Sequence, residues 1–249
     1  MSDTVLEARN ISKKFIIGTT ERLTFFKSLH NKFTGSASRE FWALKDINFK
    51  VKRGQMVAVF GHNGAGKTTL LRILAHILKP TSGACFKTLP VSCMFELGIG
   101  FNPLQTALEN VYLYGALHGI PKKEIDKKLP DIVDFAELNN FMGARLMEFS
   151  SGMRARLAFA TVMQTLKGII MVDEVLSVGD VSFQKKCTSA FEKVLNNGHT
   201  ILFISHGLGE VKKLCSKALY IEHGKQLAYS NVNEVDEMYT SRMKNFSRD

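Results

Sequence analysis

The 249-residue sequence has no uninterrupted apolar run of about 18 residues, the length at which a segment becomes a candidate membrane-spanning helix. Its first ten residues, MSDTVLEARN, lack the apolar core of a secretory signal. The four cysteines form no CxxC pair and have no histidines at zinc-finger spacing, so we expect reduced thiols with a structural role. These absences make a cytoplasmic chain the expectation.

Acidic residues are scarce relative to basic ones: 23 Asp and Glu stand against 33 Lys and Arg, a formal net charge of +10. Such an excess favours an anionic partner, and nucleic acid, a membrane surface and a nucleotide all qualify. Solubility alone would also explain it, since net charge identifies no specific site. Hydrophobic residues still make up 45% of the chain, enough for a buried core, so a wholly disordered protein is excluded.

Short apolar segments alternate with amphipathic ones along most of the chain. The strands that we predict cover 5–11, 47–51, 56–60, 169–172 and 201–204. The helices that we predict cover 68–78, 111–117, a segment opened by Pro121, 153–166 and 183–196. This alternation is typical of a parallel α/β sheet, and the helical block at 104–165 interrupts it as an inserted lobe.

A glycine-rich segment between the predicted strand 56–60 and the helix that follows satisfies the pattern G-x4-G-K-[ST]. Glycines let backbone N–H groups curl around a phosphate chain, and the helix N-terminus adds its positive dipole end. Lys67 is expected to reach the β- and γ-phosphates, and Thr68 to hold Mg²⁺ through its hydroxyl. The nucleotide-binding residues predicted here are Gly61, His62, Asn63, Gly64, Ala65, Gly66, Lys67, Thr68 and Thr69.

The apolar run 169–172 is followed directly by two carboxylates, Asp173 and Glu174. A buried strand would deliver them at its carboxyl end, the edge where ligands bind in open α/β sheets. We expect Asp173 to act on the Mg²⁺ coordination shell and Glu174 to polarise the attacking water.

A third segment, FSSGMRARLAFA at 149–160, resembles the signature of ATP-binding-cassette (ABC) ATPases, commonly LSGGQ followed by a helix with arginine. It also fits an ordinary helix N-cap at Ser150 or Ser151, and both interpretations can hold. The resemblance implies that Ser150, Ser151 and Gly152 contact the γ-phosphate of an ATP bound to the other subunit of a dimer. It also implies a D-loop with Asp180 at the subunit junction, and a strand-end histidine, His206, near the γ-phosphate or the water beside Glu174.

The segments DEVLSVGD (173–180), FQKKC (183–187) and ENVYLYGALHGI (109–120) resemble one subfamily, the ATPases of bacterial exporters of O-antigen, capsule or teichoic-acid polymers. That resemblance implies an ATP- and Mg²⁺-dependent homodimer on the cytoplasmic face of the inner membrane, paired with a separate polytopic permease. The rival class is a soluble ABC ATPase acting on nucleic acid or ribosomes. Against it, the chain has neither tandem cassettes nor an aromatic-basic stripe suited to bases, so no nucleic-acid partner is expected.

The fold implied by the resemblance is a RecA-like P-loop NTPase core of α/β class with an antiparallel β portion and an inserted helical lobe. We expect a single domain over 1–249. Within it, 1–96 and 155–249 would form the nucleotide-binding core and 97–154 the helical lobe.

The sequence departs from the family pattern at the junction of core and lobe, where many members have a glutamine. No glutamine stands in 95–103, and Glu96 is the nearest polar candidate for a contact to Mg²⁺. The glycines and proline of this segment still predict a mobile hinge.

The aromatic side chain that would stack on adenine has three candidates. Phe15 matches the family position after Ile11-Ser12-Lys13-Lys14, while Phe41 and Trp42 are rivals. Between them, 16–41 is a basic insertion with apolar residues at helical spacing. It fits a segment that contacts the membrane surface or the permease, or one that packs on its own domain.

Overall fold

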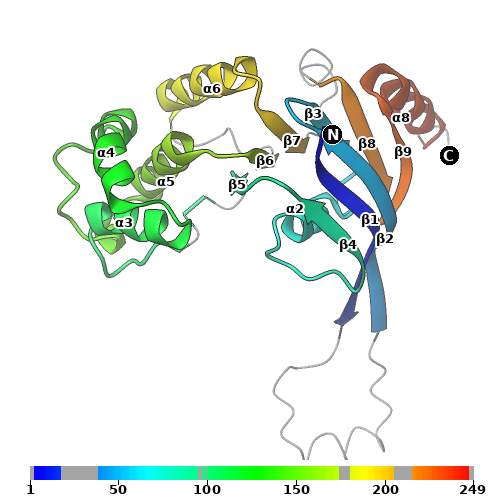
Figure 1. The fold of residues 1–249 in the computed structure, drawn as a ribbon, viewed down its shortest axis with the longest axis horizontal. Helices are drawn as coiled ribbons and strands as arrows, with labels where there is room; N and C mark the ends of the chain where they lie inside the picture. The colour runs from blue at the N-terminus through cyan, green and yellow to red at the C-terminus, as the bar shows by residue number, and fades with distance from the viewer. Residues whose placement is uncertain are drawn as a thin grey trace, which may run out of the picture.

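The computed structural model describes residues 3–17, 39–94, 97–98, 100–173, 180–204 and 215–246. Figure 1 shows a curved sheet with helices on it and, to one side, a separate group of helices. Both ends of the chain lie in the part that contains the sheet (Figure 1). Among the helices in these ranges, none combines the length and the apolar content that crossing a membrane requires.

Nine strands in the described ranges form one sheet in the order β4-β1-β2-β9-β8-β3-β7-β6-β5. The strands are β1 Thr4–Ile17, β2 Arg39–Lys52, β3 Met56–Phe60, β4 Ser82–Lys87, β5 Val91–Cys93, β6 Ile169–Asp173, β7 Thr200–Ile204, β8 Lys217–Glu222 and β9 Lys225–Asn231. Strands β8, β3, β7, β6 and β5 run parallel, whereas β1 pairs antiparallel with both β2 and β4. The predicted combination of a parallel core and an antiparallel portion is therefore present.

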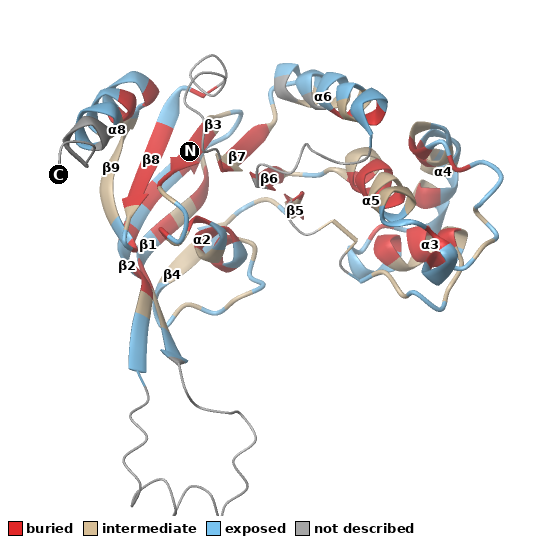
Figure 2. Cartoon of the chain, turned by 180° about the vertical axis from the view of Figure 1, so that it is seen from behind, coloured by how far each residue is buried: buried red, intermediate tan, exposed pale blue. Residues whose placement is uncertain are grey.

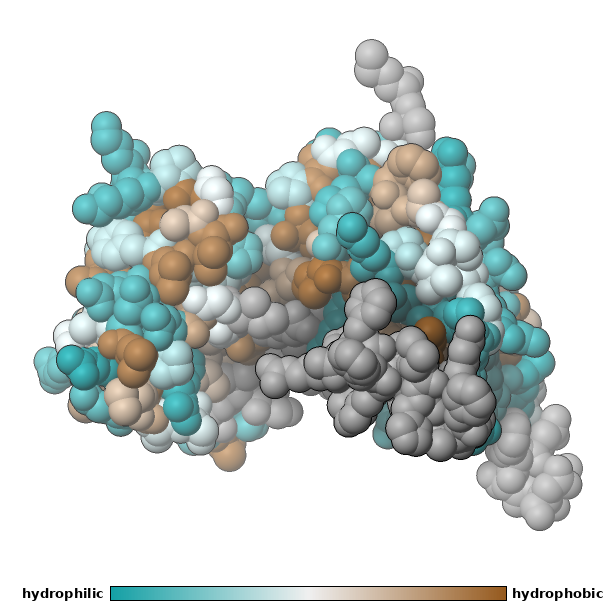
Figure 3. Space-filling view, turned by 90° about the horizontal axis from the view of Figure 1, so that it is seen from below, coloured by the Kyte–Doolittle hydropathy of each residue, from teal (hydrophilic) through white to brown (hydrophobic). Residues whose placement is uncertain are grey.

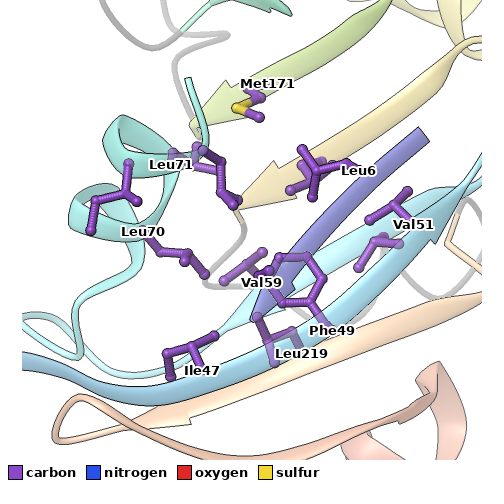
Figure 4. Close-up of a cluster of buried hydrophobic side chains, with 14 of the residues drawn as sticks. Leu6, Ile47, Phe49, Val51, Val59, Leu70, Leu71, Met171 and Leu219 are labelled. Carbon is purple, nitrogen blue, oxygen red and sulfur yellow. The ribbon is translucent and has the colours of Figure 1, made fainter. Parts of the chain in front are cut away.

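Helix α2 (Lys67–Leu74) packs against the concave side of this sheet. Its buried residues Leu70 and Leu71 meet side chains of β1, β2, β3, β6 and β8, among them Val59 and Met171 (Figure 4). A fully buried leucine contributes roughly 1.5–3 kcal/mol relative to an exposed one, so this contact anchors the start of the helix firmly. The packing therefore positions the glycine-rich segment that precedes α2.

The helical lobe consists of α3 (Ala107–Leu117), α4 (Lys122–Ala136), the short 3-10 helix η1 (Leu146–Glu148) and the first half of α5 (Ser151–Thr165). The pattern Thr106-x-x-Glu109 predicts a capping box at the start of α3, and the structure has it: the Thr106 hydroxyl accepts from the Glu109 amide at 3.2 Å and the Glu109 carboxylate accepts from the Thr106 amide at 2.7 Å. Leu157 and Ala160 of α5 pack into the lobe.

The other face of α5 packs on the sheet through Phe159 and Val162. In Figure 2 the buried residues, in red, lie on the strands and on the inward faces of the lobe helices. Because α5 belongs to both apolar clusters, no residue within it separates lobe from core, and the limits 97–154 stay a prediction.

Two helices complete the described chain. Helix α6 (Val181–Asn196) buries Phe183 and Cys187 against the cluster that holds Phe159. Helix α8 (Val232–Phe246) packs on β8 and β9 and forms an ion pair from Arg242 to Glu222 at 2.7 Å.

The first two strands are much longer than predicted. The sequence indicated strands at 5–11 and 47–51, whereas β1 continues to Ile17 and β2 begins at Arg39. The two pair along this whole length, with Phe15 opposite Phe41 and Ile17 opposite Arg39. The ends of the predicted insertion 16–41 therefore extend a hairpin stem, and the amphipathic helix expected inside it falls at 18–38, outside the described residues.

Helix α2 is shorter than predicted. It ends at Leu74 instead of 78, and Ile77 and Leu78 both donate their amides to the Arg72 carbonyl in a final turn. The left-handed φ of 63° at His76 interrupts the helical path, as a helix C-terminus commonly does.

Candidate functional site

The phosphate loop, residues 61–68, connects the carboxyl end of β3 to the first turn of α2. Gly66 occupies the N-cap position with φ 105°, a left-handed conformation that favours glycine. It has no side chain to accept from the first N–H groups of the helix, so those groups can receive an anionic ligand. The glycine-rich segment thus joins a strand to a helix N-terminus, the arrangement in which such a segment can bind an anion.

Lys67 lies beneath this loop and is only 6% exposed. Its ammonium donates to the Gly61 carbonyl at 2.6 Å and to the His62 carbonyl at 3.0 Å. A buried cation is stabilised by such hydrogen bonds, and here they hold the charge inside the curl of the loop. This is the location from which a lysine side chain can neutralise phosphate oxygens.

A hollow of about 330 Å³ opens over the loop. Its lining combines the loop with two exposed phenylalanines and one alanine: Phe15, Phe41, Ala43, Asn63, Gly64, Ala65, Gly66, Lys67, Thr68 and Thr69. The two phenylalanines are cross-strand partners on the β1–β2 hairpin, so they stand side by side in this lining. The hollow is therefore lined both by the cationic and amide groups of the loop and by two aromatic side chains.

Trp42, the third aromatic candidate, does not line this hollow. The ammonium groups of Lys14 and Lys45 each lie 5.6 Å from the centre of its indole ring. The tryptophan face is thus engaged in cation–π contacts. The structure places both Phe15 and Phe41 in the hollow beside the phosphate loop, whereas the sequence analysis considered them as alternatives.

The carboxyl ends of three parallel strands meet at the same edge of the sheet. Val59 pairs with Ile204, and Ile204 pairs with Asp173, so the last residue of β6 lies level with the end of β3 where the phosphate loop begins. The backbone of Asp173 is therefore at the predicted edge. Its side chain, Glu174, His206 and Glu96 lie outside the part that the structure describes.

The signature segment begins α5 at the lobe, away from the hollow. Ser150 is the N-cap, and its hydroxyl accepts from the Met153 amide at 3.1 Å. Ser151 and Gly152 form the first turn, and neither they nor Ser150 line the hollow. The predicted N-cap is confirmed, and within one chain the signature and the phosphate loop are not brought together.

Asp180 caps the next helix in the same way. Its carboxylate accepts from the Phe183 amide at 3.0 Å. That hydrogen bond, helped by the charge of Arg156, holds the pKa of Asp180 below its usual range, so the group is ionised at neutral pH.

None of the four cysteines, all of them in the part that the structure describes, forms a disulfide. Burial raises the pKa of Cys187 and of Cys215 to about 12, which keeps both protonated and unreactive. A larger hollow of about 680 Å³, lined by Glu7, Arg9, Lys50, Lys52 and Lys217 among others, lies at the opposite end of the β1–β2 hairpin. It contains none of the predicted nucleotide-binding residues, and its basic side chains account for a further part of the net charge.

Sequence reasoning missed the support beneath the phosphate loop. The amide of Gly224, in the turn between β8 and β9, donates to the carbonyl of Ala65 at 3.1 Å. The only available signal was a His-Gly pair between two apolar segments, which marks a turn but does not say what the turn contacts.

Comparison with known proteins identifies the family. The model of the ABC transporter family matches residues 44–177, which include the phosphate loop, the signature segment and the acidic strand. The chain is 38% identical over 205 residues to the O-antigen export system ATP-binding protein RfbB of Klebsiella pneumoniae, covering 82% of this chain and 83% of that one. It is 36% identical over 239 residues to the ABC transporter protein AbcA of Aeromonas salmonicida, covering 96% and 77%.

A third relative, the teichoic acids export ATP-binding protein TagH of Listeria monocytogenes, is 35% identical over 210 residues, covering 84% of this chain and 62% of TagH. Among solved structures, an ATP-binding subunit of an ABC transporter aligns with a TM-score of 0.71 at 19% identity, covering 95% and 93% of the two chains. A dimeric ATP-binding cassette in a post-hydrolysis state with ADP and Pi aligns with a TM-score of 0.67 at 22% identity, covering 91% and 98%. With the predicted fold confirmed, the chain belongs to the ABC transporter family and is an ATP-binding, ATP-hydrolysing member of it.

Proposed function

We propose that this protein is the ATPase subunit of a bacterial exporter that moves a lipid-linked polysaccharide across the cytoplasmic membrane. The observation that carries the proposal is a complete phosphate loop, with a buried lysine and an aromatic-lined hollow, in a chain similar to O-antigen and teichoic-acid export ATPases. The rival, a soluble ABC ATPase acting on nucleic acid or ribosomes, has no relative in its favour among those described above.

In this proposal the hollow takes ATP with its phosphates on the loop and its adenine against the hairpin. Lys67 exchanges its two carbonyl contacts for phosphate oxygens, and the amides of 63–68 surround the phosphates. Phe15 and Phe41, 37% and 48% exposed, supply the faces on which adenine stacks. Replacing both by alanine should weaken ADP binding by about tenfold or more, whereas Trp42→Ala should leave it within twofold.

Mg²⁺ fits this site by the chemistry of its donors, since the exposed Thr68 is the second residue of α2 and Asp173 ends β6, which β7 separates from β3, at the same edge of the sheet. We assign the contacts to Thr68, Asp173 and, in place of the usual glutamine, Glu96. When bound, the ion would neutralise charge on the phosphate oxygens.

Hydrolysis requires a base beside the γ-phosphate, and we assign that role to Glu174, with His206 contacting the same region. The other half of the ATP site would come from a second copy of the chain. Ser150, Ser151 and Gly152 stand at an exposed helix N-terminus, far from the chain's own hollow, as a contact made in trans would require. Asp180 would lie at the subunit junction. The dimeric cassette with ADP and Pi supports this arrangement.

The helical lobe offers a surface for the permease. Leu104, Leu117 and Met147 are 68%, 60% and 56% exposed, and the Met147 amide donates to the carbonyl of Pro103 at 2.9 Å, which brings the backbone of Met147 close to the residue before Leu104. Figure 3 shows brown, apolar residues on this part of the molecule. Exposed apolar side chains of this kind mark contact sites. Because the permease is membrane-embedded, the chain would work on the cytoplasmic face of the inner membrane, with the basic insertion 16–41 near the anionic surface.

Two variants in the native bacterium test the proposal. Glu174→Gln should abolish ATP turnover but retain ATP binding, trap a dimer with ATP on size-exclusion chromatography, and stop surface polysaccharide from appearing. Adding Lys67→Ala to the Glu174→Gln variant should prevent this dimer from forming, because ATP binding is then lost. If Glu174→Gln abolished ATP turnover but surface polysaccharide still appeared normally, the export role would be refuted, whereas the assignment of ATPase activity would stand. ATPase activity stimulated by nucleic acid, with a steep salt dependence, would favour the rival.

A further inference from the structure

The turn that joins β8 to β9 has an unusual residue at its first central position. Glu222 pairs with Lys225, so the loop between the strands is two residues long, His223 and Gly224. Their φ angles are 45° and 76°, both in the left-handed region. Two-residue hairpin turns with positive φ at both centres favour Asn-Gly or Asp-Gly, because a bulkier first residue is strained there. A histidine in this place is a cost to the fold.

This turn lies directly against the phosphate loop. The Gly224 amide donates to the Ala65 carbonyl at 3.1 Å, and the Gly224 carbonyl accepts from the Lys45 amide at 2.7 Å. A Cβ on Gly224 would come within 2.7 Å of the Ala43 carbonyl oxygen, which shows how tightly the turn is held between β2 and the loop. His223 is therefore delivered to a fixed place.

The imidazole of His223 packs on that of His62, the second residue of the phosphate loop. The ring centroids are 4.6 Å apart at an interplanar angle of 55°. On its other side, His62 has Nδ1 at 2.6 Å from the Asn63 carbonyl, and because a carbonyl only accepts, Nδ1 carries the proton. The His62 Nε2 atom is buried and has no hydrogen-bond partner among the described residues. Packing on His223 is thus one of the described contacts that hold the ring.

We propose that His223 is a positioning residue for nucleotide binding, acting through His62. The His62 carbonyl accepts from Lys67, and its neighbour Asn63 lines the nucleotide hollow, so fixing the His62 ring fixes the backbone that receives the phosphates. A turn residue less suitable than asparagine and a buried acceptor with no donor among the described residues both cost stability. Such costs persist where the surrounding structure serves a function.

The effect works by pre-organisation. A loop already held in its binding conformation pays less ordering entropy when the phosphates arrive, so the benefit appears as affinity. His223 touches no reacting atom, so the rate at saturating ATP should be insensitive to it. The inference rests on nucleotide binding by the phosphate loop, which Lys67→Ala tests separately.

His223→Asn tests this cleanly, because asparagine suits the turn better than histidine and removes only the ring. His223 is exposed, so the core is not disturbed. We expect the KM for ATP and the Kd for ADP to rise about 3- to 10-fold, the range that corresponds to about 0.7–1.4 kcal/mol, with kcat within twofold. The Tm should not fall. A change in kcat without a change in KM, or a fall in Tm that accompanies the loss of affinity, would assign His223 a merely structural role.

A double-mutant cycle with His62→Ala separates direct from indirect action. If His223 acts through His62, His223→Asn should add no further loss of ADP affinity in the His62→Ala background. Wild-type affinity in His223→Asn, or fully additive losses in the double variant, would overturn the proposal. Failure of Lys67→Ala to weaken ADP binding would instead overturn nucleotide binding by the loop.

Discussion

Gly64→Ala should weaken nucleotide binding at a limited cost to the fold. Gly64 lines the nucleotide hollow with φ 78°, and a Cβ built on it meets nothing within 4 Å. The cost to the fold is therefore only that of an alanine in the left-handed region, roughly 1–2 kcal/mol. For a chain of this size that corresponds to a fall in Tm of about 2–8 °C.

Binding is affected separately, because the new methyl group would occupy part of the hollow that Gly64 lines, where we place the phosphates. Overpacking a tight contact costs about 1–3 kcal/mol, which converts to a loss of ADP affinity of about 5- to 150-fold. Isothermal titration calorimetry with ADP and a thermal unfolding scan on the same sample measure the two effects side by side.

Gly66→Ala is the matched control. A Cβ there would lie 2.5 Å from the Ala43 carbonyl oxygen and 2.8 Å from the Leu44 side chain, so the backbone itself must shift. Its Tm should fall well below that of Gly64→Ala. If Gly64→Ala bound ADP like the wild type, the hollow would not be the phosphate cradle. If the two variants lost equal stability, the hollow would not be open as described.

Three further outcomes follow from other contacts. Lys67→Ala should lower ADP affinity at least tenfold in the same titration, because it removes the one buried ammonium that the described loop holds over its carbonyls. Thr106→Ala removes the α3 cap and should cost about 1 kcal/mol, a fall in Tm of about 2–4 °C, with ADP affinity unchanged. Hydrogen bonds from Arg9 and then Lys50 lower the pKa of Glu7 from 4.5 to about 2. The ionised carboxylate therefore contributes its full stabilisation of the fold above pH 4.5, and this stabilisation is lost as the pH falls toward 2. In Glu7→Gln, Tm should fall less steeply between pH 4.5 and 2 than in the wild type. An unchanged dependence of Tm on pH in this range would contradict the lowered pKa of Glu7.

Much of the nucleotide site could be predicted from local sequence. A glycine-rich turn between a buried strand and a helix presents amides to an anion wherever it occurs, because the donors belong to the chain's own backbone. The capping box of Thr106 and Glu109 and the N-cap at Ser150 are equally local, since each hydrogen bond spans three residues. Their short range is why the sequence pattern was sufficient.

The hairpin stem was not predictable in the same way. Residues 12–17 are too basic and irregular to indicate a strand, and they are extended because 39–46 pair with them from across the insertion. Only that pairing sets Phe15 opposite Phe41 and so places both aromatic side chains in the lining of the hollow. From the spacing of residues in the sequence, these side chains could only be proposed as alternatives to each other.

The sequence by itself determined the chemistry of this protein: a phosphate loop, an acidic strand end and a signature helix, each encoded within a few neighbouring residues. Tertiary structure alone decided what surrounds the loop, because the contacts join the loop to segments that are distant from it in the sequence. The β8–β9 turn meets Ala65 and His62 only after the sheet has assembled β8 beside β3. Register across a folded sheet is a property of paired strands, and no single segment carries it.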